Sequence, residues 1–335
     1  AQRGTSETGV TGGGYHNAPD RWRVDGALGT WTVSQSTDTP EGFSNSYKLE
    51  CTTAGATPAA DDFRVFQQYI EAQNLQHLKY GTSNAQALTL SFWVKSNKTG
   101  TYTGYFYQDD ATRLYSFSYS IDSADTWEYK TITVAGDTSG QIDNNTAKGL
   151  RATFLLAAGS NRATGSVTNA WGAYVKADEG TSNMVNLADT VGNEWYITGV
   201  QLEVGEKATP FEHRSFGDEL ARCQRYYEKS YDHGTAPGTT NTGGGVDHRY
   251  VARSTPNNYG FYTRKFATPK RAAPTVTVYG YVGTANKVSN GDTGSDLATV
   301  DTIQLSETGF LPRNTSGSSV SAQAIMFHFV ADAEL

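Results

Sequence analysis

The sequence predicts an all-β protein, with an N-terminal jelly-roll β-sandwich, a short helical connector and a smaller C-terminal β-sandwich. Three observations favour this fold class. Apolar and polar residues alternate along many short segments, turn-forming Gly, Asn and Asp residues separate these segments, and one segment alone has a convincing helical period. Alternation places successive side chains on opposite faces of a sheet. Many short strands joined by regular turns are typical of β-sandwiches.

Charge and tryptophan content divide the chain of 335 residues near residue 230. The formal net charge is −7, from 27 Lys and Arg against 34 Asp and Glu. Residues 231–335 hold eight basic and eight acidic residues, so the whole net charge lies in residues 1–230. All six tryptophans also lie in that first part. We therefore expect two domains of different composition.

The first domain, residues 1–213, is expected to be the jelly roll. The apolar segments 88–95 and 195–204 are typical of central strands, so Trp93 and Trp195 are expected in the core. Further strands are predicted at 30–34, 46–51, 115–121, 127–133 and 150–157.

The connector, residues 214–230, contains the predicted helix. Ser215 is a suitable N-cap, and the helix is expected to run to about Tyr227. A helix this short is marginal alone, so its apolar stripe must pack against a domain or another subunit. Cys223 is then expected to be a small buried side chain. The stripe lies at positions i, i+4, i+7 and i+11, occupied by Phe216, Leu220, Cys223 and Tyr227.

The second domain, residues 231–335, is expected to be the smaller sandwich. A loop rich in Gly and Thr opens it, at 234–245. Strands are predicted at 259–266, 273–281 and 321–330.

Composition argues against several classes of function. Nucleic-acid binding needs basic patches, which a net acidic chain does not favour. No apolar run approaches the ~18 residues of a membrane-spanning helix, so no membrane insertion is expected. The two cysteines, Cys51 and Cys223, are too few for a disulfide framework or a zinc cluster.

No catalytic constellation is visible, and we expect the protein not to be an enzyme. The adjacent acidic pairs Asp61-Asp62 and Asp109-Asp110 point apart in a strand or turn, whereas glycoside hydrolysis needs two carboxylates across one bond. The six histidines are scattered singly, so no metal site is predicted. No cofactor is expected. A structural calcium ion is compatible with a jelly roll, but no residues indicate a position for it.

Aromatic side chains give the best indication of a binding function. Tyr105 and Tyr107 share one face of a predicted strand, and Tyr115 and Tyr119 share one face of its presumed partner. Tyrosine rings stack against the apolar faces of sugars, and their hydroxyl groups hydrogen-bond sugar hydroxyls. The alternative for each ring is burial in the core. These four tyrosines are the candidate carbohydrate-binding residues.

One resemblance rests on the segments Gln2-Arg3-Gly4-Thr5-Ser6, Ala18-Pro19-Asp20-Arg21-Trp22, residues 199–205 with 208–212, residues 219–227 and residues 327–335. Together these segments resemble a family of bacteriophage virion structural proteins, including tail-fibre-like proteins. The resemblance implies a first domain similar to jelly-roll carbohydrate-binding modules, and assembly as a homotrimer with other virion proteins on the virion exterior. More sequence usually precedes the first of these segments in the family, which suggests that an attachment region is missing here or very short. Loss of an initiator Met before Ala1 is the simpler alternative.

The resemblance and the aromatic residues together suggest a fibre or spike that binds host-surface glycan during adsorption. Such particles assemble in the reducing cytoplasm of a bacterium, where a disulfide between Cys51 and Cys223 is not expected. The low charged content, 18%, fits contact with neutral sugars. Two alternatives remain open. One is a capsid decoration or head-fibre protein with a purely structural role, and the other is a polysaccharide depolymerase.

Overall fold

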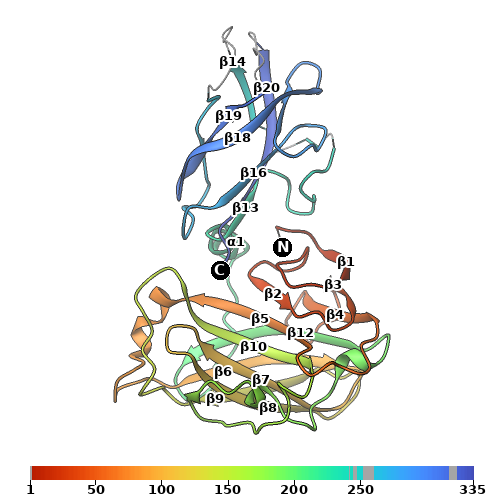
Figure 1. The fold of residues 1–335 in the computed structure, drawn as a ribbon, viewed down its shortest axis with the longest axis vertical. Helices are drawn as coiled ribbons and strands as arrows, with labels where there is room; N and C mark the ends of the chain where they lie inside the picture. Colours follow the sequence, from red (N-terminus) through yellow and green to blue (C-terminus); the bar gives the residue numbers. More distant parts are fainter. Residues whose placement is uncertain (1, 241, 244–246, 252–259, 317–322) are drawn as a thin grey trace. The chain divides into compact units, whose positions relative to one another are not determined.

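The computed structural model describes residues 2–240, 242–243, 247–251, 260–316 and 323–335. The chain forms two compact units, which are coloured red to green and mostly blue in Figure 1. The N-terminal unit is formed by Thr5–His213 together with Leu335. The C-terminal unit contains Arg214–Glu334 and also residues 2–4. The connector therefore clusters with the C-terminal unit, and so does the beginning of the chain.

Two six-stranded antiparallel sheets make up the N-terminal unit. The first has the order β1-β3-β4-β12-β6-β9, and the second has the order β11-β8-β7-β10-β5-β2. The strands of the first sheet are β1 (Ser6–Val10), β3 (Thr30–Ser36), β4 (Ser46–Thr53), β6 (Leu88–Ser96), β9 (Glu128–Val134) and β12 (Glu194–Val204). Those of the second are β2 (Trp22–Asp25), β5 (Phe63–Glu71), β7 (Gly100–Gln108), β8 (Arg113–Ile121), β10 (Lys148–Ala158) and β11 (Gly172–Ala173). Three short 3-10 helices join strands, η1 (Ala72–Leu78), η2 (Lys176–Glu179) and η3 (Leu187–Asp189).

The core of this unit lies between the two sheets. Trp195 of the first sheet packs against Phe66 and Phe154 of the second, with ring centroids 5.6 Å apart in both pairs. All three side chains are buried, and full burial of one such side chain contributes about 1.5–3 kcal/mol to stability. The predicted all-β sandwich is confirmed, and so is the core position of Trp195.

Residues 209–212, which we call the strap, are held by two side chains of β12. The Gln201 carboxamide oxygen accepts the backbone N–H of Glu212 at 2.8 Å. The Glu203 carboxylate accepts the backbone N–H of Thr209 at 3.0 Å and also its hydroxyl group. The segment that carries part of the family resemblance thus has a structural role, because its polar side chains fasten the strap to the sheet.

The strands of the C-terminal unit form one hydrogen-bonded network around β20. The first half of β20 pairs with β14 and β17, and the second half pairs with β13 and β16. Its apolar core includes Phe310, Phe327 and Phe329. The strands are β13 (Tyr227–Lys229), β14 (Asp247–Val251), β15 (Arg264–Lys265), β16 (Thr275–Tyr279), β17 (Lys287–Asn290), β18 (Asp296–Ser306), β19 (Gly309–Asn314) and β20 (Gln323–Asp332).

Helix α1 (Phe216–Gln224) begins where the sequence predicts, since the Ser215 hydroxyl oxygen accepts the N–H of Asp218 at 3.2 Å. The predicted end is wrong. Tyr227 is the first residue of β13, where it pairs with β20 and is buried. The rest of the stripe is not buried in this chain. Phe216 is 70% exposed, and Leu220 and Cys223 are only half-buried, so Cys223 is not buried within this chain, and its burial against another subunit stays a prediction.

No disulfide joins Cys51 and Cys223. None of the helices in the described part of the chain is long and apolar enough to cross a membrane.

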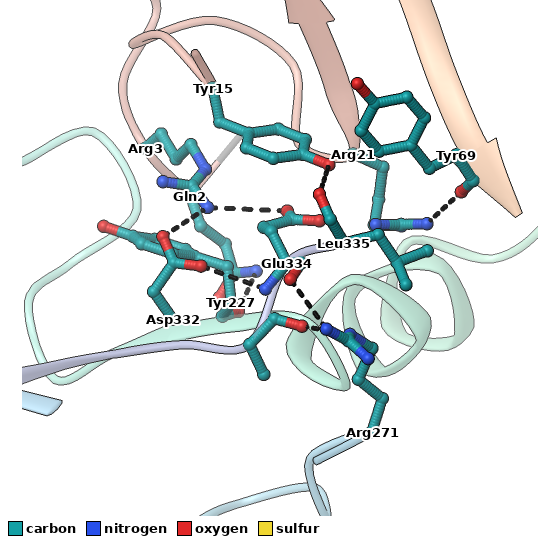
Figure 2. A network of polar contacts seen from close by, with 11 residues as sticks. Gln2, Arg3, Tyr15, Arg21, Tyr69, Tyr227, Arg271, Asp332, Glu334 and Leu335 are labelled. Carbon is teal, nitrogen blue, oxygen red and sulfur yellow. Dashed lines mark hydrogen bonds and ion pairs between the residues drawn. The ribbon is translucent and has the colours of Figure 1, made fainter. Parts of the chain in front are cut away.

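The first residues of the chain complete the C-terminal unit, as Figure 2 shows. The side-chain amide of Gln2 donates to the backbone carbonyl of Tyr227 at 2.8 Å. Arg3 lies 3.8 Å above the Tyr227 ring and donates to Asp332 at 3.0 Å and to Glu334 at 3.4 Å. Burial of Tyr227 therefore depends on residues that lie more than two hundred positions earlier in the sequence.

Candidate functional site

A cleft of about 580 Å³ lies on the second sheet of the N-terminal unit. Sites for small ligands typically measure ~300–1,000 Å³, so the cleft has room for a few sugar rings. Its lining comes from β2, β5, β7 and β10 and from the segments around residues 12–13, 162 and 174–179. The side chains that carry its chemistry are Arg23, Asp25, Gln67, Tyr69, Tyr105, Tyr107, Arg151, Arg162, Tyr174 and Glu179.

Strand pairing explains why these side chains share one face. Residues opposite each other on neighbouring strands point the same way, and the next row begins two residues along. One row crosses β7, β10 and β5 through Tyr107, Arg151 and Tyr69. The next row crosses the same strands through Tyr105, Thr153 and Gln67 and continues into β2 at Arg23.

A hydrogen-bonded network fixes the polar groups at the centre of the cleft. The Gln67 amide nitrogen donates to Asp25 at 2.6 Å and to the Tyr69 hydroxyl at 3.0 Å, and its oxygen accepts from Thr153 at 3.2 Å. Arg23 donates to the other Asp25 oxygen at 2.6 Å. Polar groups held in this way need little reordering when a ligand binds.

Two half-buried tyrosines present rings to the cleft. Tyr107 and Tyr174 lie at right angles, with centroids 5.3 Å apart and an interplanar angle of 87°. Tyr69 and Tyr105 are more deeply buried and form the floor. Burial raises the pKa of the Tyr69, Tyr105 and Tyr174 hydroxyls, so these groups keep their protons at neutral pH. They therefore combine an apolar surface with hydrogen-bonding hydroxyl groups.

Ion pairs support both sides of the cleft. Arg162 donates to Glu179 at 2.6 Å, and Glu179 also accepts the Tyr174 hydroxyl at 2.7 Å. Arg151 donates to both carboxylate oxygens of Asp109. Burial lowers the pKa of Arg151, but the hydrogen bonds and charge of Asp109 outweigh this effect, and the net shift is upward. All of these arginines remain charged.

The four predicted tyrosines divide between the two faces of the second sheet. Tyr105 and Tyr107 line the cleft. The prediction is wrong for Tyr115 and Tyr119, which belong to the core between the sheets. In the β7–β8 pairing Tyr105 lies opposite Ser116, while Phe106 lies opposite Tyr115. Tyr115 and Tyr119 therefore point away from the cleft, and no ligand there can reach them.

Most residues of the cleft are absent from the sequence-based prediction. Tyr69, Gln67, Arg151 and Arg23 are polar or amphipathic residues within strands that otherwise supply the core. The sequence carries a visible signal for Arg151, because this charged residue interrupts an apolar run. The sequence does not indicate that Tyr174 and Glu179 line the cleft, because they lie in a loop and in η2 and follow no strand periodicity.

The first sheet carries a second groove, of about 1030 Å³, beneath the strap. The expected core position of Trp93 is wrong, since Trp93 is only half-buried and lines this groove. Its ring lies 5.3 Å from that of Tyr129, directly opposite on β9. Phe211 of the strap packs against Phe43 at the other side, with centroids 5.1 Å apart. Substitutions in this aromatic groove can therefore serve as controls for substitutions in the cleft.

Among the described residues, no group of three or more His, Cys, Asp or Glu side chains is arranged to hold a metal ion.

A buried arginine donates hydrogen bonds to backbone carbonyls from two separate segments of the chain. The Arg64 guanidinium donates to the carbonyl oxygens of Leu28 and Gly29 at 3.2 Å, of Thr11 at 3.3 Å and of Gly12 at 3.5 Å. Arg64 thus joins residues 11–12 to residues 28–29, and Gly12 lines one side of the cleft.

No family model matches the chain, and no curated protein matches it. Among solved structures, the enzymatically active domain of bacteriophage CBA120 tailspike protein 4 is 16% identical over 55% of this chain, with a TM-score of 0.33. The chain spans 19% of that tailspike structure. A family 11 carbohydrate-binding module from Clostridium thermocellum, in complex with a β-1,3-1,4-mixed-linked tetrasaccharide, is 12% identical over 61% of this chain and 99% of its own, with a TM-score of 0.31. The CBM22-1 xylan-binding domain of Paenibacillus barcinonensis Xyn10C is 9% identical over 62% of this chain and 100% of its own, with a TM-score of 0.28. Similarity this low carries no argument about function.

Proposed function

We propose that this chain is a phage virion protein that binds host-surface glycan through the cleft of its N-terminal β-sandwich. The observation that carries the proposal is the perpendicular pair of half-buried rings, Tyr107 and Tyr174, beside a fixed network of hydrogen-bonding groups. Sugars offer apolar C–H faces to such rings and hydroxyl groups to such networks. The family resemblance in the sequence supports the virion role.

The test compares variants of the cleft with a variant of the opposite sheet. Tyr107→Ala and Tyr174→Ala should each weaken binding to host polysaccharide by about tenfold, because each removes a stacking surface. Tyr129→Ala is the matched control, since Tyr129 is 44% exposed but lies in the groove of the first sheet. Binding is measured by surface plasmon resonance, after a glycan array has identified the ligand.

Loss of binding in Tyr129→Ala but not in the two cleft variants would show that glycan binds in the groove of the first sheet and not in the cleft. Absence of binding to every host polysaccharide would refute the glycan-binding function and favour a structural role in capsid decoration.

We expect binding without cleavage. Glycoside hydrolysis needs one carboxyl group as a proton donor and a second as nucleophile or base. The two carboxylates that line the cleft, Asp25 and Glu179, are each ion-paired with an arginine, Arg23 and Arg162. Incubation of the protein with its ligand should release no reducing ends. Their appearance would instead favour a depolymerase.

The exposed stripe of α1 supports assembly as a homotrimer. A helix with Phe216 70% exposed leaves apolar surface that a neighbouring subunit can cover. Because single glycan contacts are often weak, three linked sites would raise the avidity for a host surface. Phe216→Asp should reduce the trimer fraction in analytical ultracentrifugation, whereas a trimer of unchanged stability would show that the subunits contact each other elsewhere.

The proposed location on the virion exterior can be tested by imaging whole particles.

A further inference from the structure

Cationic side chains gather around the ring of Tyr69, at one end of the cleft. The Lys148 ammonium lies 4.4 Å from the ring centroid, the Arg151 guanidinium 5.5 Å and the Arg23 guanidinium 5.6 Å. Arg21 donates to the Tyr69 carbonyl oxygen at 2.6 Å, as Figure 2 shows. This concentration of positive charge lies in the part of the chain that carries the whole net negative charge.

Carboxylates offset part of this positive charge, and the buried Glu71 lies opposite Lys148 in the pairing of β10 with β5. Asp25 pairs with Arg23, and Asp109 pairs with Arg151. Within the residues that the structure describes, no carboxylate forms an ion pair with Lys148. Burial lowers the pKa of Lys148 and the neighbouring Arg151 lowers it further, although the charges of Asp109 and Asp25 oppose this shift. The charged ammonium is therefore less favourable here than in water, and a bound anion would relieve that cost.

A β-bulge brings Lys148 to the face that carries Arg151. Residues three apart on a regular strand point to opposite faces. In the pairing of β10 with β5, Lys148 lies opposite Glu71 and Leu150 lies opposite Ile70, so one extra residue, Gly149, stands between them. A Cβ atom at position 149 would come within 2.6 Å of the Ala72 Cα atom, so the bulge needs glycine. Bulges often re-aim a side chain beside a functional site.

We propose that Lys148, beside Arg151 and Tyr69, forms an anion subsite at this end of the cleft, and that the ligand is an acidic glycan. The anionic group is a carboxylate or a sulfate on a sugar ring. A guanidinium and an ammonium both form strong charge-assisted hydrogen bonds with such oxygens. Tyr107 lies under Arg151, 4.8 Å from its guanidinium, and places an aromatic surface next to the subsite. This inference rests on the proposed glycan-binding function and replaces the neutral ligand that composition suggested.

The test uses the full chain and pairs of probes that differ in charge. A β-1,4-mannuronan hexasaccharide is compared with the β-1,4-mannan hexasaccharide, and dextran sulfate is compared with dextran. A glycan array of acidic and neutral bacterial polysaccharides extends the comparison to other backbones. We expect acidic members to bind at least about tenfold more tightly at low salt, with a preference that falls as salt rises. The first pair reports on carboxylates and the second on sulfates.

Lys148→Met is the diagnostic variant, and Lys207→Met is its matched control. Each removes one positive charge from the N-terminal unit, but Lys207 lines the groove of the first sheet. Lys148→Met should weaken binding to the acidic probe by about tenfold and should not lower the melting temperature, because it removes a charge that folding disfavours. A purely structural lysine would lower the melting temperature instead.

Each other outcome has a definite meaning. Equal or tighter binding of the neutral glycans would overturn the anion subsite and leave the proposed function standing. Equal losses in the two lysine variants would show general electrostatic attraction and would also overturn the subsite. Absence of binding to every glycan, acidic or neutral, would overturn the proposed function itself.

Discussion

Lys270 and Glu228 form a buried ion pair in the C-terminal unit, with 2.6 Å between the ammonium nitrogen and the carboxylate oxygen. The Lys270 side chain is fully buried, and it also donates to the carbonyl oxygens of Gln224 and Thr268. Glu228 accepts the backbone N–H of Ala267. The pair thus joins the end of α1 and β13 to the segment that follows β15.

Removal of one partner of this pair should be strongly destabilising. Lys270→Met leaves a buried carboxylate without its counter-ion, and we expect the free energy of unfolding to fall by about 3–5 kcal/mol. The double variant Lys270→Met, Glu228→Gln should recover part of this loss, because no charge is then left unpaired. Urea denaturation measures both. Lys176→Met breaks an exposed pair with Asp61 and should change nothing measurable, so a similar loss there would argue against this explanation.

Arg64 should be essential for the stability of the N-terminal unit. Burial lowers its pKa to about 10, yet at neutral pH the guanidinium is charged and holds the carbonyls of residues 11–12 and 28–29. Arg64→Met removes the guanidinium donors from these oxygens, of which that of Leu28 still accepts from the Trp31 indole N–H, and should cost about 3 kcal/mol or more, as measured by urea denaturation. Arg64→Lys should cost less, because an ammonium group restores some donors. Equal stability of the Met variant and the native chain would refute this role.

Tyr119 and Tyr107 should respond differently to replacement by alanine. Tyr119 is buried against Phe92, with ring centroids 5.2 Å apart, so Tyr119→Ala should lower the free energy of unfolding by about 3–5 kcal/mol. Tyr107→Ala should weaken glycan binding with a much smaller effect on stability, because Tyr107 is only half-buried. Calorimetry and a binding assay on the same preparations separate the two effects. A reversal of this pattern would contradict the assignment of the two faces.

His328 should make the C-terminal unit sensitive to mild acid. Its ring is buried, stacks on Tyr231 with centroids 3.8 Å apart, and is hydrogen-bonded to the hydroxyls of Ser230 and Thr242. Burial lowers its pKa below the ordinary 6.5, although the charge of Asp232 opposes this shift. The unfolded chain therefore binds a proton more readily, and stability falls as the pH drops below about 6.5.

Urea denaturation at pH 7.5, 6.5 and 5.5 checks this expectation for His328. His328→Gln removes the titrating group, so its free energy of unfolding should fall less than that of the native chain between pH 6.5 and 5.5. Identical pH dependence in the two proteins would show that other groups control acid sensitivity.

Alternation in the sequence predicts which residues share a face, but it does not predict which face meets the other sheet. The alternation correctly predicts a common face for Tyr115 and Tyr119, and in the structure that face is the core. Trp93 lies in an apolar strand, yet its side chain points to the outer groove. These orientations depend on the register between strands that are distant in sequence. The fold class follows from local pattern, whereas the assignment of faces needs tertiary contacts.

The candidate site depends on strand pairing and side-chain contacts between residues that are far apart in the sequence. Lys148 and Arg151 share a face only because of the bulge at Gly149, and nothing in the local pattern marks that bulge. The sequence indicates no role for Asp109, but its carboxylate holds Arg151 in the cleft. The helical periodicity predicts an end for α1 that is too late, because pairing of Tyr227 with β20 overrides that periodicity.

The contacts of Arg3 with Asp332 and Glu334 have a consequence for the order of events during synthesis. The ribosome delivers Arg3 more than three hundred residues before Asp332 and Glu334. The intervening Thr5–His213 can complete its sandwich while the chain is still growing, whereas the C-terminal unit must wait for its last strand. Until then Arg3 lacks its contacts with Asp332 and Glu334, and a nascent chain stalled before β20 should expose residues 2–4 to protease while its first sandwich is already resistant.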